Sequence, residues 1–121
     1  MANVRALLNL EGCVSVVTGG ATGIGFQMAT GLAEAGSNIV LCSRKVEVCE
    51  ASCAELEKLG VKTLAVACDV TKPEQVEALK DAVLTKFGRV DVLMNNAGRA
   101  WVAPPEDMPL DRWQQVMDLN I

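Results

Sequence analysis

The chain has 121 residues, half of them hydrophobic, with a net charge of −4 and an isoelectric point near 4.8. This acidic balance disfavours nucleic-acid binding, which normally needs a basic patch. No apolar run approaches the roughly 20 residues that span a bilayer, and the start, MANVRALLNLEG, lacks the regions of a signal peptide. We therefore expect one cytoplasmic domain with neither a membrane nor a nucleic-acid partner.

Apolar and amphipathic stretches alternate along the chain. Four short apolar runs predict strands, at residues 14–17, 38–42, 62–68 and 89–94. Helical spacing predicts the other elements, at residues 25–36, at 45–60, after a capping box of Thr71 and Glu74, and from Leu110 onward. Such alternation is typical of βαβ units. We predict an α/β, Rossmann-type doubly wound parallel sheet of four strands in the order 3-2-1-4, with helices on both faces.

The chain contains five cysteines, an odd number, with no Cys-x-x-Cys motif and no histidine. Cys49 and Cys53 lie one helical turn apart, which leaves a metal site possible. Together with Leu56, however, they form an apolar stripe, and free cysteine behaves as a small buried hydrophobe. We therefore predict core packing, no metal site, and the reduced thiols of a reducing compartment.

The segment VVTGGATGIG places four glycines at the end of the first predicted strand. A strand that turns sharply into a helix can bring bare backbone N–H groups close to an anion, and the helix N-terminus favours negative charge. A tight turn alone could also explain the glycines. Their position at the start of a βαβ unit favours a dinucleotide pyrophosphate site.

The motifs TGGATGIG (residues 18–25), CDVT (68–71) and NNAG (95–98) resemble, in order and spacing, those of the short-chain dehydrogenase/reductase family. The resemblance covers essentially the whole chain. A looser similarity, through NNAGRAWVAPPEDMP, is to gluconate 5-dehydrogenase-like and 3-ketoacyl-reductase-like members.

The resemblance implies a role for each matched position. The pyrophosphate would be bound by Gly19, Thr22, Gly23, Ile24 and Gly25. Asp69 would accept a hydrogen bond from the adenine amino group and Val70 would pack on the ring, although Asp69 could also be a simple turn residue. The adenosine ribose and the approach to the nicotinamide would be lined by Asn96, Ala97 and Gly98. Asn95 and Thr18 would tie the fourth strand to the first.

The tip of the second strand bears on the choice of cofactor. An acidic residue there would bind the ribose 2′-hydroxyl of NAD, but Ser43 stands in its place and Arg44 follows. The planar guanidinium suits a phosphate. We therefore predict NADP in preference to NAD, the alternative being that Arg44 is a solvated surface residue.

The last predicted helix carries Leu110, Trp113 and Met117 on one face, which marks it as the buried face in a complete protein. In residues 1–121 alone, we expect the helix to lack the partners that bury Trp113 and Met117. Asn120 is the next residue on this face. It could be a helix-terminal or buried structural asparagine. The resemblance implies instead the asparagine of the catalytic Asn-Ser-Tyr-Lys tetrad, which holds a water linking the lysine to solvent. In the preceding loop, Trp101 and Val102 could contact a substrate. Trp101 could instead anchor the loop.

The family's general acid is a tyrosine in Tyr-x-x-x-Lys, whereas this chain has no tyrosine and no histidine. We interpret residues 1–121 as the NAD(P)-binding half of a reductase, truncated within the helix that carries Asn120. The full-length parent would be an NADP-dependent oxidoreductase that interconverts a carbonyl and a secondary alcohol, and a homo-oligomer. The alternative is a non-catalytic dinucleotide-binding module or an inactive fragment; a methyltransferase is disfavoured by the motifs. With its fourth strand at an exposed edge, the chain is expected to be marginally stable or to associate.

Overall fold

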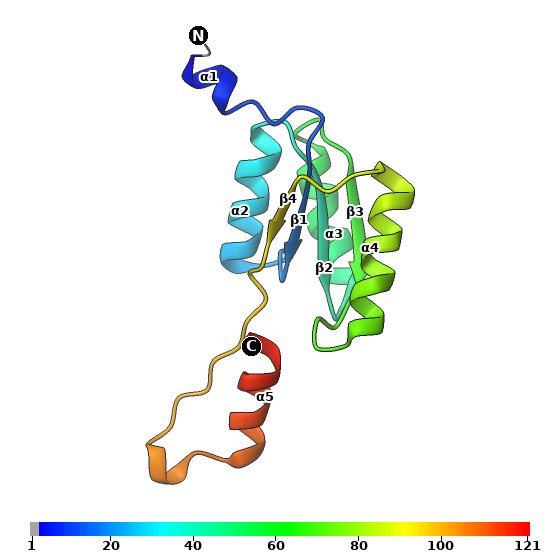
Figure 1. The fold of residues 1–121 in the computed structure, drawn as a ribbon. Coiled ribbons are helices and arrows are strands. Elements are labelled where there is room, and N and C mark those ends of the chain that lie inside the picture. Colours follow the sequence, from blue (N-terminus) through cyan, green and yellow to red (C-terminus); the bar gives the residue numbers. More distant parts are fainter. Residues whose placement is uncertain (1–2) are drawn as a thin grey trace.

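The computed structural model describes residues 3–121 and has the predicted α/β architecture (Figure 1). The strands are β1 (Val14–Thr18), β2 (Asn38–Ser43), β3 (Thr63–Ala67) and β4 (Val92–Met94). The helices are α1 (Val4–Leu7), α2 (Gly23–Glu34), α3 (Val46–Glu57), α4 (Pro73–Phe87), the short 3₁₀ helix η1 (Pro105–Asp107) and α5 (Leu110–Asn120). The predicted strands and long helices are all present, within a few residues of their expected bounds.

The four strands form one parallel sheet in the order β3-β2-β1-β4, as predicted. Val16 lies opposite Val40 of β2 on one side and opposite Leu93 of β4 on the other. Because all strands run in the same direction, their carboxyl ends meet at one edge of the sheet. Ligands of such sheets bind outside this edge, where the strand order reverses, which here is between β1 and β4.

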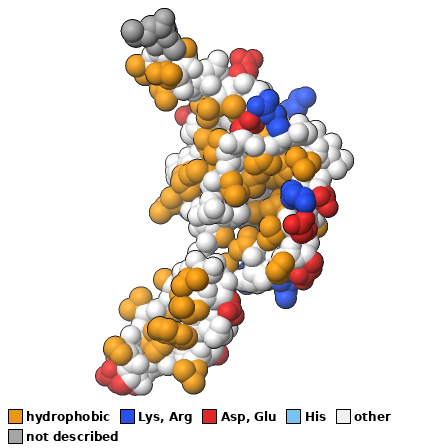
Figure 2. All heavy atoms as spheres, viewed as in Figure 1, with side chains coloured by type: hydrophobic (Ala, Val, Ile, Leu, Met, Phe, Trp, Pro, Cys, Tyr) orange, Lys and Arg blue, Asp and Glu red, His pale blue; other side chains and the backbone are white. Residues whose placement is uncertain are grey.

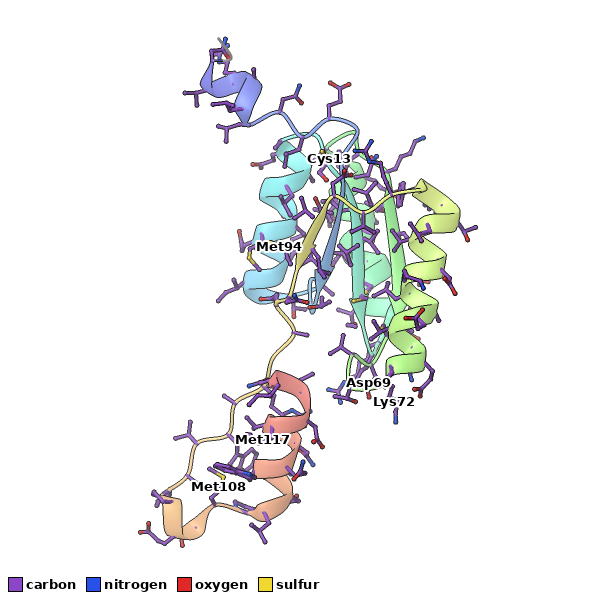
Figure 3. The ribbon with its side chains drawn as sticks, in the orientation of Figure 1. Cys13, Asp69, Lys72, Met94, Met108 and Met117 are labelled. Atoms are coloured by element: carbon purple, nitrogen blue, oxygen red, sulfur yellow. The ribbon has the colours of Figure 1, made fainter. Side chains whose placement is uncertain are left out.

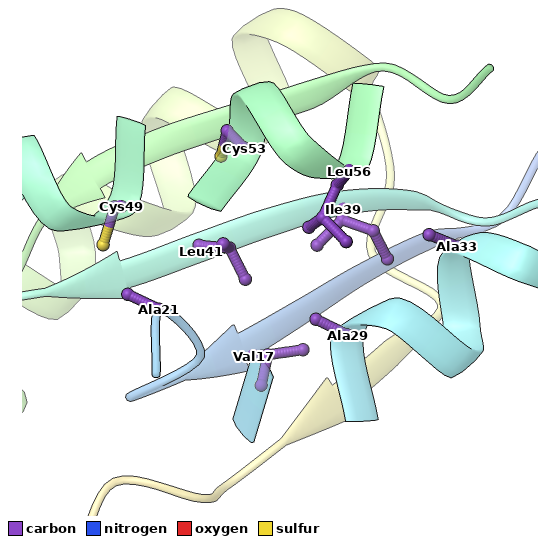
Figure 4. Packing of buried hydrophobic residues seen from close by; sticks show 9 residues of the cluster. All are labelled: Val17, Ala21, Ala29, Ala33, Ile39, Leu41, Cys49, Cys53 and Leu56. Atoms are coloured by element: carbon purple, nitrogen blue, oxygen red, sulfur yellow. The ribbon is translucent and has the colours of Figure 1, made fainter. Parts of the chain in front are cut away.

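Apolar residues cover both faces of the sheet, so the strands are apolar without alternation, as buried parallel strands are. On one face, Val17 and Leu41 pack with α2 and α3 (Figure 4). On the other, Val14 and Val16 pack against α4 through Leu79 and Val83. Cys49, Cys53 and Leu56 are buried in the first cluster, which confirms that the cysteine stripe belongs to the core.

The start of α4 differs from the prediction. Its N-cap is Lys72, with no side-chain cap, so the capping box of Thr71 and Glu74 is wrong. The Thr71 hydroxyl instead donates to Oδ1 of Asp69 at 2.6 Å. A hydrogen bond to a carboxylate is charge-assisted and strong. It holds Thr71 in the turn that precedes the helix.

Helix α5 and the loop before it extend beyond the carboxyl ends of the strands (Figure 1). The apolar face of α5 is not covered by the sheet: Leu110 is 85% exposed and Trp113 56%. Hydrophobic side chains gather on this part of the surface (Figure 2). Helical periodicity marks an apolar face but does not supply the element that covers it. The exposure agrees with the expectation for residues 1–121 alone.

Candidate dinucleotide-binding site

The glycine turn, residues 18–25, joins the end of β1 to the start of α2. Gly19 and Gly23 have φ angles of +62° and +57°, in the left-handed region that favours glycine. A Cβ on Gly25 would lie 2.5 Å from Nδ2 of Asn96 and 2.5 Å from the Gly19 carbonyl. Gly25 is therefore needed so that α2 can approach the end of β4.

The neighbours of these glycines differ from those that we expected. We expected the bare positions to make room for a pyrophosphate, but at Gly19 and Gly25 the close neighbours belong to the protein itself. Among the glycines of this turn, only Gly23 combines a positive φ with open space where a Cβ would lie. The N-cap of α2, Thr22, makes no side-chain cap, so the first amides of the helix have no side-chain acceptor there. Such an N-terminus suits an anion.

Thr18 and Asn96 hold the end of β4 against the glycine turn. The Thr18 hydroxyl accepts the N–H groups of Asn96 and Ala97, both at 3.0 Å, and donates to the Met94 carbonyl at 3.3 Å. Nδ2 of Asn96 donates to the carbonyls of Thr18 and Gly19, both at 3.1 Å. The expected role of Thr18 is confirmed, but its partner is Asn96; Asn95, for which we predicted this role, is exposed.

Asp69 follows β3, and Figure 3 shows it with Lys72 at the carboxyl end of the sheet. Its Oδ1 accepts both the backbone N–H and the hydroxyl of Thr71, at 3.0 and 2.6 Å. These bonds hold the pKa of Asp69 below its ordinary value, so the side chain is an anionic acceptor at neutral pH. The turn role of Asp69 is thus present, and it leaves Oδ2 outside these bonds.

At the tip of β2, Ser43 and Arg44 differ in their surroundings. The Ser43 hydroxyl donates to the Lys45 carbonyl at 3.0 Å and accepts from the Lys45 N–H and from Sγ of Cys49, both at 3.2 Å. The Arg44 side chain is exposed. The first residue therefore shapes the turn, and the second presents its guanidinium to the surroundings.

Two neighbouring clefts lie along this edge of the sheet. One of about 180 Å³ is lined by Gly19, Cys42, Ser43, Arg44, Cys68, Asp69, Val70, Ala97, Gly98 and Leu119. A second of about 320 Å³ is lined by Gly19, Ala21, Thr22, Ser43, Arg44, Lys45 and Val48. The structure therefore brings most of the predicted site residues, from four strand ends, onto two clefts that share Gly19, Ser43 and Arg44.

Two buried cysteines form the floor of the first cleft. Burial raises the pKa of Cys42 to about 12, and burial likewise raises that of Cys68. Both are therefore neutral thiols that act as apolar wall. Leu119 was missed by the sequence reasoning, because it reaches the cleft only through the path of the loop before α5. Lys45, at the tip of the second strand, lines the second cleft.

Asn120 is the last residue of α5, exposed at the surface, and its side chain is bonded to the backbone of Arg99. Trp101 lies under the Arg112 guanidinium, 4.5 Å from the ring centroid, and lines an apolar cleft with Met108, Trp113, Val116 and Met117. Figure 3 shows Met108 and Met117 close together on this unit. These contacts support the loop-anchor interpretation of Trp101.

The arrangement fits a dinucleotide. The first cleft offers an apolar floor and an anionic acceptor for adenine. The second cleft is bordered by a helix N-terminus and by a guanidinium, and both of these groups bind phosphates. Residues 3–121 contain no cluster of three His, Cys, Asp or Glu side chains suited to a metal, and none of the helices in this range is long and apolar enough to cross a membrane. The composition supplies no tyrosine or histidine for general acid catalysis.

Comparison with known proteins agrees with this geometry. The family model described as short chain dehydrogenase matches residues 13–121. A 3-oxoacyl-[acyl-carrier-protein] reductase of rhamnolipid biosynthesis from Pseudomonas aeruginosa is 36% identical over 113 residues, which are 93% of this chain and 44% of that protein. The chain thus spans less than half the length of the curated relative that it matches.

Solved structures of short-chain dehydrogenases and related enzymes are also similar to this chain. A short-chain type dehydrogenase/reductase from Mycobacterium marinum superposes with a TM-score of 0.94 at 34% identity, over 98% of this chain and 47% of that one. The NADP complex of Pseudomonas aeruginosa RhlG gives a TM-score of 0.88 at 36% identity, over 94% and 44% of the two chains. NAD⁺-bound xylitol dehydrogenase gives 0.89 at 37% identity, over 93% and 44%.

Both cofactors therefore occur among its structural neighbours, and the family uses NAD or NADP. The sheet order, the glycine turn and the family model lead to one assignment. This chain belongs to the short chain dehydrogenase family and carries the part of the fold that binds a nicotinamide dinucleotide.

Proposed function

We propose that residues 1–121 are the NADP-binding half of an oxidoreductase that transfers a hydride between the nicotinamide and a carbonyl or secondary alcohol. The observation that carries the proposal is that Arg44 borders both clefts, beside the start of α2. A guanidinium at this position can form paired, charge-assisted bonds to a 2′-phosphate. The parent protein would be a cytoplasmic homo-oligomer.

The roles of the site residues follow from their places along the clefts. The turn residues Gly19, Thr22, Gly23, Ile24 and Gly25 would bind the pyrophosphate. Asp69 and Val70 would hold the adenine, Ser43 would shape the turn that presents Arg44, and Asn96, Ala97 and Gly98 would line the ribose. When bound, the dinucleotide would supply the hydride for carbonyl reduction or accept it in alcohol oxidation. Asn120 would be the asparagine of the parent's catalytic tetrad, which holds a water linking the lysine to solvent.

The test is a fluorescence titration of the 121-residue chain with NADPH and with NADH. Arg44→Ala is expected to weaken NADPH binding by about 10- to 100-fold, because a hydrogen bond to a charged group contributes roughly 1.5–3 kcal/mol. NADH binding should change by less than about twofold, since NADH lacks the 2′-phosphate. Unchanged NADPH affinity in Arg44→Ala would remove the basis of the proposal.

Lys58→Ala is the matched control. Lys58 is a cation at the C-cap of α3 that pairs with Glu55 at 2.9 Å, away from both clefts. Its removal lowers the net charge by the same amount as Arg44→Ala. An equal loss of NADPH affinity in both variants would assign the effect to overall charge and contradict a specific phosphate site.

The second candidate, a dinucleotide-binding module without catalysis, is favoured by the lack of tyrosine and histidine in the chain. The two candidates differ in what the reading frame encodes after Ile121: a serine followed by Tyr-x-x-x-Lys would support the oxidoreductase, and a stop codon would support the binding module. Both candidates predict that residues 1–121 alone are inactive. Incubation of the chain with NADPH and a panel of ketones should leave the absorbance of the reduced nicotinamide unchanged. Turnover by the chain would show that it contains a general acid not identified among its residues.

A further inference from the structure

Helix α3 supports the glycine turn from behind. The Ser52 hydroxyl donates to the Ala21 carbonyl at 2.7 Å, across 31 residues of sequence. Ala21 is only 7% exposed, and its side chain belongs to the same core cluster as Cys49 and Cys53 of α3 (Figure 4). The turn is thus attached to α3 by one hydrogen bond as well as by apolar packing.

This hydrogen bond fixes the orientation of the peptide between Ala21 and Thr22. A peptide is planar and trans, so its C=O and N–H groups point in opposite directions. Because the carbonyl is bonded to Ser52, the Thr22 N–H must point away from Ser52. Thr22 is the exposed N-cap of α2 and borders the cleft of about 320 Å³. Loss of the bond would free this peptide to rotate.

The same helix also holds the opposite wall of that cleft. Sγ of Cys49 donates to the Ser43 hydroxyl, which is itself bonded to the backbone of Lys45. Arg44 lies between Ser43 and Lys45 in the sequence. The glycine turn on one side and the turn with Arg44 on the other are therefore both anchored to α3, Ser52 acting on the first and Cys49 on the second.

We propose that Ser52 is a positioning residue that holds the Thr22 amide at a fixed place relative to Arg44, and so favours NADP over NAD. Ser52 does not line either cleft and would not touch the dinucleotide. A 2′-phosphate must reach the guanidinium while the pyrophosphate rests on the start of α2, so the spacing of the two walls affects NADP more than NAD. This inference rests on the proposed function.

The test compares Ser52→Ala with Ser52→Thr, which keeps a hydroxyl. Alanine is a better helix former than serine, so Ser52→Ala should still fold. We expect it to weaken NADPH binding by about fivefold, the equivalent of one net hydrogen bond, and NADH binding by less than about twofold. Ser52→Thr should restore NADPH affinity to within about twofold of the original value.

Amide hydrogen exchange without dinucleotide gives a second readout that does not depend on the cofactor. The Phe26 amide donates to the Thr22 carbonyl at 3.3 Å. In Ser52→Ala it should exchange faster, while the amides of β1 keep their rates. The matched control is Thr30→Val, because the Thr30 hydroxyl donates to the Phe26 carbonyl at 2.8 Å within α2 and lies outside both clefts. It should alter neither dinucleotide affinity nor exchange in the turn.

Two results overturn the inference: unchanged NADPH affinity in Ser52→Ala, or an equal loss for NADPH and NADH. Failure of the unsubstituted chain to bind either dinucleotide would instead refute the proposed function. In that case the exchange rates still test whether Ser52 positions the glycine turn. Faster exchange of the Phe26 amide, with unchanged rates in β1, supports the positioning role, and an unchanged Phe26 rate rejects it.

Discussion

The side chain of Asn120 pairs with the backbone of Arg99 through two hydrogen bonds. Its Oδ1 accepts the Arg99 N–H at 2.9 Å and its Nδ2 donates to the Arg99 carbonyl at 2.8 Å. A side-chain amide thereby acts as a short piece of antiparallel strand. It joins the last residue of α5 to the segment that follows β4, and it does so beside Gly98, which lines the cleft of about 180 Å³.

Asn120→Ala should therefore loosen α5 from the rest of the chain. Two solvent-exposed hydrogen bonds contribute about 1–2 kcal/mol together, and the Arg99 amide should lose its protection from hydrogen exchange. Asn120→Asp can still accept from the N–H but cannot donate, so its effect should be intermediate. Urea unfolding and exchange measurements check both variants.

The control for this prediction is Gln114→Ala. Gln114 donates to Asp118 at 2.6 Å on the same helix without touching the segment after β4. It should leave Arg99 exchange unchanged. Equal protection of the Arg99 amide in Asn120→Ala and in the original chain would contradict the proposed connection.

Gly25 and Gly31 lie in the same helix and predict opposite results. Gly25→Ala places a methyl 2.5 Å from the Gly19 carbonyl and from Asn96, so it should destabilise the chain by about 1–3 kcal/mol, as overpacking does. Gly31→Ala meets no atom within 4 Å and should stabilise α2 by about 0.5–1 kcal/mol. Chemical denaturation measures both. Similar effects of the two substitutions would show that Gly25 tolerates a side chain.

Asp91 predicts a pH dependence of stability. Its carboxylate accepts from Nη2 of Arg89 at 2.6 Å and from the Val14 N–H at 2.8 Å, and these bonds hold its pKa below the ordinary value. Because the folded-state pKa is lower than the unfolded one, the stabilisation is present above about pH 4. It is lost as the pH falls through the folded-state pKa.

Asp91→Asn should thus lower the free energy of unfolding at pH 7, and the difference from the original chain should disappear under strongly acidic conditions. Asp107→Asn, in the exposed helix η1, is the control, because the Asp107 side chain has no hydrogen bond or ion pair within residues 3–121. Thermal melts between pH 2 and pH 7, a range of roughly five units, bracket the transition. A difference that persists at the lowest pH would argue against this linkage.

Strand β4 predicts association. It pairs only with β1, which leaves its other edge open, and Leu93 in its centre is 56% exposed. Open, apolar edges pair with other chains. Sedimentation velocity should show oligomers that increase with concentration, and Leu93→Lys should reduce them. Leu84→Lys, on the surface of α4, should not. A monomer at all concentrations would contradict the prediction.

Much of the fold could be predicted because the signals were local. The apolar runs identified all four strands, and the right-handed crossover rule left the order 3-2-1-4 as the natural arrangement. Burial of Cys49, Cys53 and Leu56 followed from their spacing alone. Such patterns depend on the periodicity of strands and helices, which the sequence carries directly.

The incorrect predictions share one cause: more than one pairing of hydrogen-bonding groups was possible. Thr71 could cap α4, yet it bonds to Asp69. Asn95 and Asn96 have identical side chains, and only the path of the backbone after β4 decides that Asn96 reaches Gly19. In each case the sequence names the groups able to interact, and the fold selects the pair.

The sequence by itself determined the class of fold, the place of the glycine turn and the cation beside it, because these depend on residue type and short-range spacing. Only the tertiary structure decided that Gly25 makes room for Asn96, that Ser52 holds the turn, and that Asn120 closes on Arg99. These contacts join residues 21 to 71 positions apart, and their distances are set by the packing of helices on the sheet, which no local pattern encodes.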